Sequence, residues 1–408
     1  MMEIKAFKAI RPKKELASEI AALPYDVYSV KEAREIIKKN PKSFLQVDLP
    51  AATVDDEVKN LNEIALLNFN NLKKKGYFYK EDRDKLYIYS LTMKGKTQVG
   101  LVACASIDEY LEGKIKKHEF TRKDKEADRV DHVDKLDANT GPIFLTYKSL
   151  DEINKIIYSE IKEIPEIDFR TEDGVNHKIW TIEDEDTIEK LITLFKNVEN
   201  FYIADGHHRC ASAVKVGLKR REENKDYTGN EEFNYFLSLI FPSKEVEIMD
   251  YNRVVKDLNN FTEKEFLEKL RENFEVEVAK TSPYKPEGKG CFGMYLSDNW
   301  YKLKVKDELV KDDIIERLDV SILQNLVLDK ILGIKNPRTD ERIDFVGGIR
   351  GLYELEKRTR EDMQIAFSLY PTSLEELFEV ADAGEVMPPK STWFEPKPLS
   401  GLFIHELK

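Results

Sequence analysis

The feature that most constrains the fold of this chain is an abrupt change from an apolar run to a helical pattern near its middle. Residues 200–204 close an apolar segment, and the polar sequence Asp205-Gly206-His207-His208-Arg209 follows at once. Small and apolar residues then recur between 211 and 218 at the spacing of one helix face. A buried strand, a polar turn and a helix in this order predict an α/β unit.

This turn is suited to an anion. The first backbone N–H groups of a helix have no partner within the helix, and the helix dipole is positive there, so a phosphate group is the natural ligand. Arg209 adds a forked donor, and histidines such as His207 and His208 donate hydrogen bonds or move protons near neutral pH. Two alternatives remain open: Asp205 as an ordinary helix cap, and a metal site built from Asp205, His207 and His208.

Composition limits the class of partner. The chain has 408 residues, with 65 basic against 77 acidic side chains and a net charge of -12. This acidic excess argues against nucleic acid or an anionic membrane as a general partner, but it allows a local basic pocket for a small phosphate compound. With no apolar run of about 18 residues and no paired cysteine spacing, we expect a soluble protein of the reducing cytoplasm.

The wider pattern predicts a mixed α+β fold. Two strand-like runs joined by a short turn precede the motif, and the densely charged stretch 112–137 is expected to be a solvated helix or a lid. An antiparallel insertion and one long core helix are expected in the C-terminal half. The ranges are 85–93 and 97–107 for the first two strands, 274–278, 291–296 and 300–305 for the insertion, and 315–332 for the core helix.

Two polar groups of residues elsewhere are candidates for the same site. In the sequence His118-Glu119-Phe120-Thr121-Arg122, His118 and Glu119 offer a base and phosphate contacts, together with Arg129, if the preceding strand delivers them to the cleft. The alternative is the start of a solvated charged stretch. Asp26 lies on a loop just before a capped helix and is a candidate general base; its alternative is an ordinary Asx turn.

A third candidate segment lies near the C-terminus. Residues 387–398 combine prolines, hydroxyls, lysines and aromatics without helix or strand periodicity. We interpret them as a rigid wall of the site, from which Lys390, Ser391 and Thr392 reach phosphate oxygens; an irregular packed arm is the alternative. The sequence contains neither GxxxxGK[ST] nor GxGxxG, so a P-loop or Rossmann enzyme is not expected.

The Asp-Gly-His-His-Arg run, placed between a strand and a small-residue helix, resembles the phosphate-binding box of the ParB/sulfiredoxin-like superfamily, and most of all that of free-serine kinases. Across nearly its whole length the chain also resembles a large conserved microbial family. That resemblance rests on Pro24-Tyr25-Asp26-Val27, His118-Glu119-x-Thr121, Asn139-Thr140-Gly141-Pro142 and the terminal Pro-Lys-Ser-Thr-Trp-Phe-x-Pro-Lys.

The resemblance implies a domain organisation and an activity. Residues 1–230 would form a ParB/sulfiredoxin-like core with insertions, residues 231–340 an inserted α+β subdomain, and residues 341–408 a segment that completes the active site. The implied reaction is phosphorylation of a small alcohol, most plausibly L-serine to O-phosphoserine, from pyrophosphate, ADP or ATP with Mg²⁺. The implied partners are small molecules rather than nucleic acid or membrane, and a homodimer is an open candidate.

The roles implied for the side chains follow the same resemblance. Asp26 or Glu119 would take the hydroxyl proton, because the early Glu of the serine kinases has no evident counterpart here. Asp205 would organise Mg²⁺ or the substrate amine. The alternatives are a ParB-like nucleotide-binding regulator without turnover and a metal-dependent hydrolase. The phosphate and substrate contacts would come from Gly206, His207, His208, Arg209, His118, Thr121, Arg129, Lys390, Ser391 and Thr392.

Overall fold

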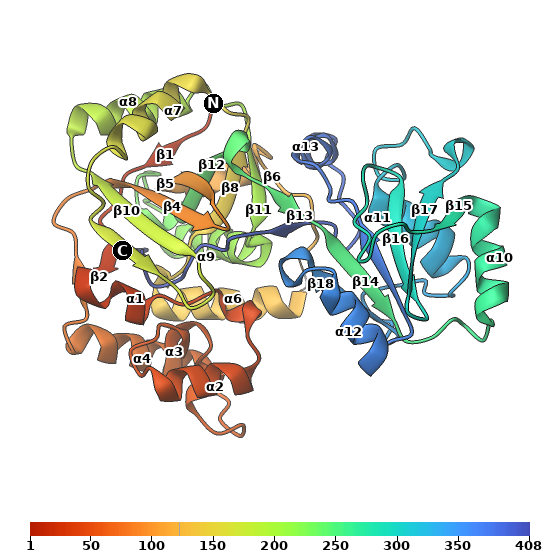
Figure 1. Ribbon diagram of the computed structural model, residues 1–408. Helices are drawn as coiled ribbons and strands as arrows, with labels where there is room; N and C mark the ends of the chain where they lie inside the picture. The colour runs from red at the N-terminus through yellow and green to blue at the C-terminus, as the bar shows by residue number, and fades with distance from the viewer. Residues whose placement is uncertain (122) are drawn as a thin grey trace. The chain divides into compact units, whose positions relative to one another are not determined.

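The computed structural model describes residues 1–121 and 123–408, with the side chains of residues 124 and 125 outside that description. Arg122 of the predicted polar group therefore lies outside the described residues. The chain divides into two compact units, Met1–Val246 with Pro396–Lys408, and Glu247–Glu395. Each unit has its own sheet, which confirms the mixed α+β class that the sequence predicts (Figure 1).

The first unit is built on a mixed nine-stranded sheet of order β6-β11-β8-β12-β5-β4-β10-β9, with β1 paired to β5. Two short ladders, β2 with β3 and β7 with β21, complete it. Its strands are β1 (Ile4–Lys5), β2 (Ile10–Pro12), β3 (Phe78–Lys80), β4 (Leu86–Met93), β5 (Lys96–Ser106), β6 (Ile115–Lys116), β7 (Ala138–Asn139), β8 (Ile143–Tyr147), β9 (Ile167–Arg170), β10 (Asn176–Ile182), β11 (Phe201–Asp205), β12 (Tyr235–Pro242) and β21 (His405–Glu406).

Helices cover both faces of this sheet. Helices α7 and α8 lie on one side, and α9 and α6 lie on the other, with α2, α3 and α4 beyond α6 (Figure 1). The helical elements are α1 (Ala17–Ile20), the 3₁₀ turn η2 (Tyr25–Val27), α2 (Val30–Lys39), α3 (Leu45–Asp48), α4 (Leu61–Lys74), α5 (Ile107–Leu111), α6 (Lys123–Leu136), α7 (Asp151–Glu160), α8 (Glu185–Phe195) and α9 (His207–Glu223).

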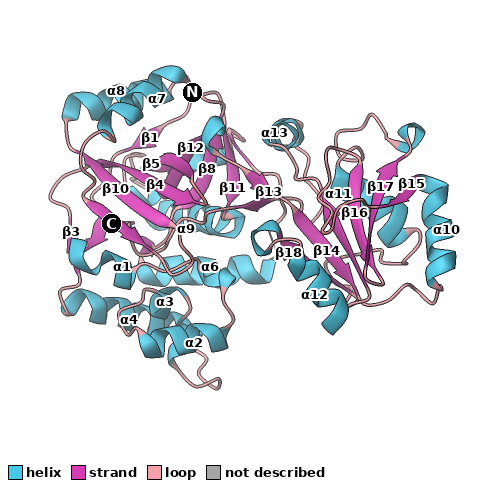
Figure 2. Ribbon diagram, in the orientation of Figure 1, coloured by secondary structure: helices cyan, strands magenta, loops and turns pink. Residues whose placement is uncertain are grey.

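The second unit contains a six-stranded antiparallel sheet of order β15-β17-β16-β19-β14-β18, and a short ladder of β13 with β20 (Figure 2). The predicted antiparallel insertion is confirmed. Its elements are β13 (Ile248–Met249), β14 (Tyr251–Val255), α10 (Glu263–Asn273), β15 (Phe274–Val278), β16 (Cys291–Leu296), β17 (Asn299–Val305), the 3₁₀ turn η6 (Asp307–Leu309), α11 (Asp319–Leu323), the π-helical turn η7 (Gln324–Asp329), β18 (Ile343–Gly347), α12 (Tyr353–Glu361), β19 (Ile365–Leu369), α13 (Leu374–Asp382) and β20 (Trp393–Phe394).

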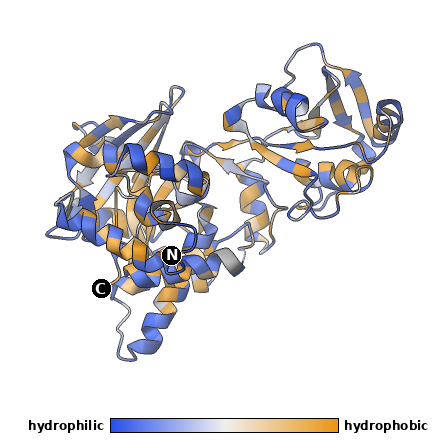
Figure 3. Ribbon diagram, turned by 90° about the horizontal axis from the view of Figure 1, so that it is seen from below, coloured by the Kyte–Doolittle hydropathy of each residue, from blue (hydrophilic) through white to orange (hydrophobic). Residues whose placement is uncertain are grey.

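The hydrophobic core of the first unit explains why β11 is a strand. Phe201, Tyr202, Ile203 and Ala204 are all buried, because helices cover both faces of the sheet at this point. The helices themselves alternate polar and apolar bands, as the hydropathy colouring shows (Figure 3). Fully burying one large apolar side chain contributes roughly 1.5–3 kcal/mol, so this run fixes β11 in the middle of the unit.

The boundaries of the units differ from the expected ones at 230 and 340. Strand β12 extends to Pro242 and pairs with β5 and β8, which keeps it in the first unit. Strands β18 and β19 both pair with β14, so most of the segment after 340 belongs to the second unit. Only Pro396–Lys408 returns to the first unit.

The long core helix expected over 315–332 is wrong in its regular form. Helix α11 has five residues and continues directly as the π-helical turn η7. A π turn advances five residues where an α turn advances about four. The buried position therefore moves from the expected Leu326, which is half-buried, to Val327, five residues after the buried Ile322.

Among the helices of the described residues, none combines the length and the apolar character of a membrane-spanning segment.

The close packing of α9 allows a stability prediction at Gly217. A Cβ placed there would lie 2.5 Å from the backbone oxygen of Phe233 and 2.7 Å from Cδ1 of Ile107. Gly217→Ala is therefore expected to lower the free energy of unfolding by about 1–3 kcal/mol, although alanine favours helix formation. Urea denaturation followed by circular dichroism measures this. Gly288→Ala, which meets open space, is the matched control; equal stability of both variants would contradict the prediction.

Candidate functional site

The predicted strand-to-helix turn is present. Strand β11 ends at Asp205, Gly206 has φ 92° and ψ 31°, and α9 begins at His207. This left-handed backbone favours glycine, and a Cβ at Gly206 would also lie 3.1 Å from the guanidinium of Arg209. The first helical hydrogen bond runs from the N–H of Cys210 to the carbonyl of Gly206. Since glycine has no side chain to cap the helix, its positive end remains suited to an anion.

Asp205 is held by a lysine from the far end of the chain. Its Oδ2 lies 3.0 Å from Nζ of Lys397, and its Oδ1 accepts a hydrogen bond of 2.9 Å from the N–H of Gly206. Burial alone would raise the pKa of Asp205, but Lys397 and Arg209 outweigh it and hold the pKa below its ordinary value. Asp205 is therefore an anion at neutral pH.

The guanidinium of Arg209 is fixed on one edge and available on another. Its Nη1 donates a hydrogen bond of 2.8 Å to the carbonyl of Pro142. A Cβ at Gly141 would lie 2.7 Å from Oγ of Ser400 and 3.3 Å from Nη1 of Arg209, so a residue without a side chain is needed there. Within the described part of the chain, no residue accepts a hydrogen bond from Nε or Nη2 of Arg209. These two donors can bind a ligand oxygen.

His118 and His207 form a buried pair of rings beside Asp205. The ring centroids are 4.7 Å apart at an interplanar angle of 84°. Strand β6 brings His118 to this place, because it pairs in parallel with β11 two residues before His118. The sequence-based condition that a strand deliver His118 to the box is thus met.

Both rings are neutral at pH 7. Burial lowers the pKa of His118 to about 4, although a hydrogen bond with the backbone of Ile203 and the charge of Asp205 oppose the shift. Burial, and then the proximity of His118, place the pKa of His207 well below its ordinary value. His207 is 8% exposed, and its Nε2 has no hydrogen-bond partner among the described residues. A buried polar atom without a partner has a free-energy cost, which a ligand could offset.

Thr121 and Arg129, two of the predicted phosphate contacts, bind protein groups instead. Thr121 donates a hydrogen bond of 2.5 Å to Glu126, which also pairs with Lys215. Arg129 is buried, binds Asp128 through Nε and Nη2, and donates from Nη1 to a backbone carbonyl of α3. Both side chains therefore support α6 and its surroundings.

Arg129 also places the loop that carries Asp26. Its guanidinium lies 4.2 Å from the ring centroid of Tyr25, a cation–π distance. Tyr25 in turn lies near enough to Arg209 for that charge to lower its pKa, although burial dominates and raises it. Asp26 follows Tyr25 and is exposed. The loop with Asp26 is thus connected to the box through Tyr25.

Asp48 is a site residue that the sequence did not reveal. It is 4% exposed, and its Oδ1 accepts a hydrogen bond of 2.8 Å from Thr140. Burial raises its pKa, against hydrogen bonds from Ser400 and Thr140 and the charges of Arg129 and Arg209. Asp48 therefore lies between the two arginines and connects α3 to the terminal segment. Nothing in the short apolar context of residues 44–49 signals this role.

Lys390, Ser391 and Thr392 belong to the second unit, where Lys390 and Ser391 have contacts of their own. The carbonyl of Lys390 accepts a hydrogen bond of 2.9 Å from Arg253, and Oγ of Ser391 donates one of 2.7 Å to the carbonyl of Pro388. The lysine that contacts Asp205 is Lys397, from the same C-terminal motif. Two lysines stand in that motif, and its pattern alone does not tell which one reaches the box.

The protein groups around Asp205 do not build a metal cage. Both of its oxygens are engaged, by Lys397 and by the N–H of Gly206. In residues 1–121 and 123–408 no group of three His, Cys, Asp or Glu side chains is arranged to hold a metal ion. The predicted role of Asp205 as a magnesium ligand therefore finds no support in the surrounding donors.

With this geometry in place, the chain can be compared with known proteins. A family model described as "Protein of unknown function (DUF1015)" matches residues 4–321. The chain belongs to this family. The match includes the box of β11 and α9 and extends into the second unit as far as α11. Among curated proteins, none matches the chain.

Several solved structures are similar to this DUF1015 member. A free serine kinase variant in complex with ADP has 18% identity and a TM-score of 0.36, covering 73% of this chain and 88% of its own. A conserved hypothetical protein from Pyrococcus furiosus has 17% identity, a TM-score of 0.34 and coverages of 74% and 94%. A C-terminally truncated SbnI from Staphylococcus aureus has 13% identity, a TM-score of 0.38 and coverages of 73% and 85%.

The Asp205–Lys397 contact leads to a prediction about charge. Lys397→Met removes the nearest cation, so the pKa of Asp205 should rise by roughly 1–2 units, as expected for loss of one opposite charge at this distance. Carboxyl ¹³C chemical shifts recorded against pH measure it. Lys219→Met, on the exposed side of α9 and paired with Asp134, is the control. An unchanged pKa in Lys397→Met would show that Arg209 alone sets the charge of Asp205.

The neutral state of His118 predicts a pH dependence of stability. Its pKa is about 4 in the native state against the ordinary 6.5. Between these values the unfolded chain binds a proton that the native chain does not, so the free energy of unfolding falls as pH drops from 6.5 to 4. His118→Asn should make this decrease shallower, as urea denaturation at pH 7 and pH 5 can show. An identical decrease in both proteins would contradict burial as the cause.

Proposed function

We propose that this chain is a phosphotransferase that phosphorylates a small alcohol, with free L-serine as acceptor and O-phosphoserine as product. The observation that carries the proposal is the N-terminus of α9, which has no side-chain cap and is flanked by Arg209 and Lys397. Phosphoryl transfer requires mainly an aligned nucleophile and neutralised phosphate oxygens. A helix N-terminus beside two fixed cations supplies the second requirement.

Arg209 and the first turn of α9 hold the transferred phosphoryl group in this proposal. Because Nη1 of Arg209 is anchored on Pro142, its Nε and Nη2 edge keeps a fixed direction beside Gly206. Such preorganised donors stabilise developing charge without rearrangement during the reaction. His207 is neutral, so its ring donates a hydrogen bond to a phosphate oxygen only in the tautomer with the proton on Nε2.

Asp205 orients the acceptor. It stays ionised at neutral pH, which suits it to bind the ammonium group of free serine. Lys397 holds it in place and leaves it partly exposed, at 29% for the aspartate side chain against 16% for the lysine. Mg²⁺ enters the proposal with the phosphates of the donor, since Mg²⁺ in phosphoryl-transfer sites is commonly held by one or two carboxylates and by substrate phosphates. No step assigned to these residues depends on it.

The base that takes the hydroxyl proton is Asp26 or Glu119. Asp26 is joined to the box through Tyr25, which packs on Arg129. Glu119 follows His118, whose ring contacts His207, and it is half-buried. Each carboxylate thus lies one residue away from a side chain that faces the box, and both stay in the proposal. The donors in the proposal are pyrophosphate, ADP and ATP.

The test is ³¹P NMR of the protein with L-serine, Mg²⁺ and each donor in turn. Appearance of the O-phosphoserine resonance with one donor and its dependence on serine support the proposal. A thermal shift with ATP, ADP or CTP but no phosphoserine with any donor would instead support a nucleotide-binding regulator. The absence of both responses would overturn the assignment of the α9 N-terminus to phosphate.

Two substitutions examine the roles of the box. Asp205→Asn and Arg209→Gln should each lower kcat/KM for serine by about 100-fold or more, the usual effect of removing one preorganised charged contact. Lys219→Gln lies on the same helix with its side chain 48% exposed and should leave kcat/KM unchanged. Circular dichroism checks that the variants are folded. Full activity in folded Asp205→Asn and Arg209→Gln proteins would show that the reaction takes place elsewhere.

A further inference from the structure

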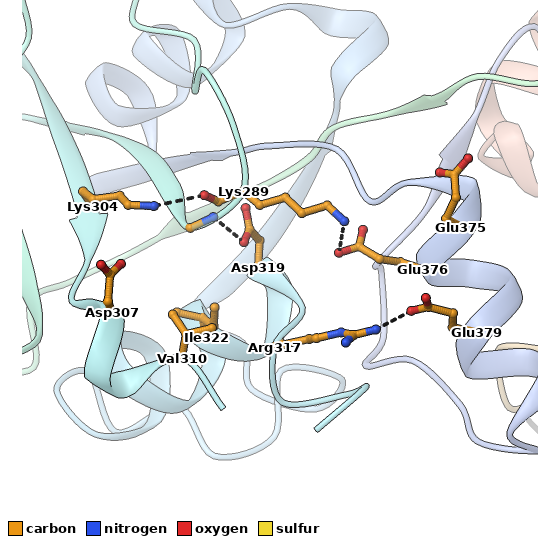
Figure 4. A pocket seen from close by; sticks show the side chains of 11 residues that line it. Lys289, Lys304, Asp307, Val310, Arg317, Asp319, Ile322, Glu375, Glu376 and Glu379 are labelled. Atoms are coloured by element: carbon orange, nitrogen blue, oxygen red, sulfur yellow. Dashed lines mark hydrogen bonds and ion pairs between the residues drawn. The ribbon is translucent and has the colours of Figure 1, made fainter. Parts of the chain in front are cut away.

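The second unit contains a pocket that is separate from the box of β11 and α9. Its volume is about 660 Å³, within the usual range for small-molecule sites. The pocket lies among β17, the turn η6, α11 and α13, and between their side chains run Lys289 and Gly290 from the loop before β16 (Figure 4). Every lining residue belongs to the second unit.

Its charges do not balance. Five carboxylates and three cations line the pocket, which leaves a net charge of two negative units when all are ionised. The cations are already engaged. Lys289 pairs with Glu376 at 2.7 Å, Arg317 pairs with Glu379, and Lys304 donates a hydrogen bond of 3.3 Å to a backbone carbonyl (Figure 4).

The unmatched groups are the carboxylates of Asp319, Asp307 and Glu375. Asp319 accepts a hydrogen bond of 2.8 Å from the N–H of Gly290 through Oδ1, while its buried Oδ2 has no hydrogen-bond partner among the described residues. Asp307 lies at the end of the pocket next to Lys304, and Glu375 lies at the α13 end (Figure 4). A buried carboxylate oxygen without a donor is costly, and a cationic ligand would offset that cost.

The surface between these carboxylates is partly apolar. Val310 and Ile322 lie side by side between Asp307 and Arg317 (Figure 4). A ligand that fits this order of groups has positive charges separated by a hydrocarbon chain. We propose that this pocket binds an aliphatic diamine or polyamine, with one ammonium on Asp319 and another on an outlying carboxylate, Asp307 or Glu375.

The protonation of Asp319 adds a pH dependence to this binding. Burial raises its pKa to about 7, and Glu376 raises it further, against the N–H of Gly290 and the charges of Lys289 and Lys304. An ammonium ligand favours the ionised form, so binding below pH 7 must first remove a proton. The affinity should therefore rise as pH increases from 6 to 8.

Isothermal titration calorimetry of the full chain tests the proposal, with putrescine and spermidine as ligands and butylamine as the matched monoamine. We expect the diamine and the polyamine to bind at least tenfold more tightly than butylamine, and their affinity to fall with added salt. Equal affinity for butylamine, or no binding of either at low ionic strength, would overturn the proposal. So would saturable binding of amino acids in their place.

Variants locate the site. Asp319→Asn keeps an acceptor for Gly290 but removes the charge, and Asp307→Asn acts at an exposed residue where misfolding is not expected. Each should weaken spermidine binding at least tenfold. Glu361→Gln on α12, 58% exposed and outside the pocket, is the control and should bind as the unaltered protein does. Unchanged affinity in both aspartate variants would place any polyamine binding elsewhere.

Discussion

The contact between Asp205 and Lys397 is the interaction on which the candidate site depends. It joins the end of β11 to a residue 192 positions later in the chain, and it sets the charge of the carboxylate at the start of α9. The terminal segment that carries Lys397 also supplies Ser400, whose backbone pairs with Ala22 and whose side chain reaches Asp48. Closure of the first unit by its last residues and assembly of the site are therefore the same event.

Local patterns predicted much of the fold, because they report burial. The apolar run before Asp205 is a strand buried on both faces, and the three strand-like runs of the insertion pair as expected. The prediction failed where the backbone departs from regular geometry. In residues 315–332 the apolar spacing is that of an α-helix, yet the chain turns as a π-helix after α11 and exchanges one buried position for its neighbour. Periodicity reports the facing side, and it cannot report an extra residue in one turn.

The site was predictable to the extent that its parts are contiguous. Five residues of the box stand together in the sequence, and His118 joins them through the ladder of β6 and β11. Asp48 and Lys397 were not found, because a lone aspartate or lysine acquires meaning only from a partner far away in the chain. Thr121 and Arg129 were assigned to phosphate for their chemistry, but their hydrogen bonds are already made within the protein. Residue type alone does not distinguish a ligand contact from a support.

The charges of the site explain why its histidines are neutral. A charged imidazolium in the interior would have to lose its hydration, and the nearest anion, Asp205, is already matched by Lys397 and Arg209. Because Asp205 is compensated in this way, it cannot hold the two rings in the charged form. Positive charge thus remains on Arg209, on Lys397 and at the helix N-terminus, where an anion is reached from solvent, and the buried rings add hydrogen bonding without added charge. Such a division of roles favours binding of a phosphate group over retention of a proton.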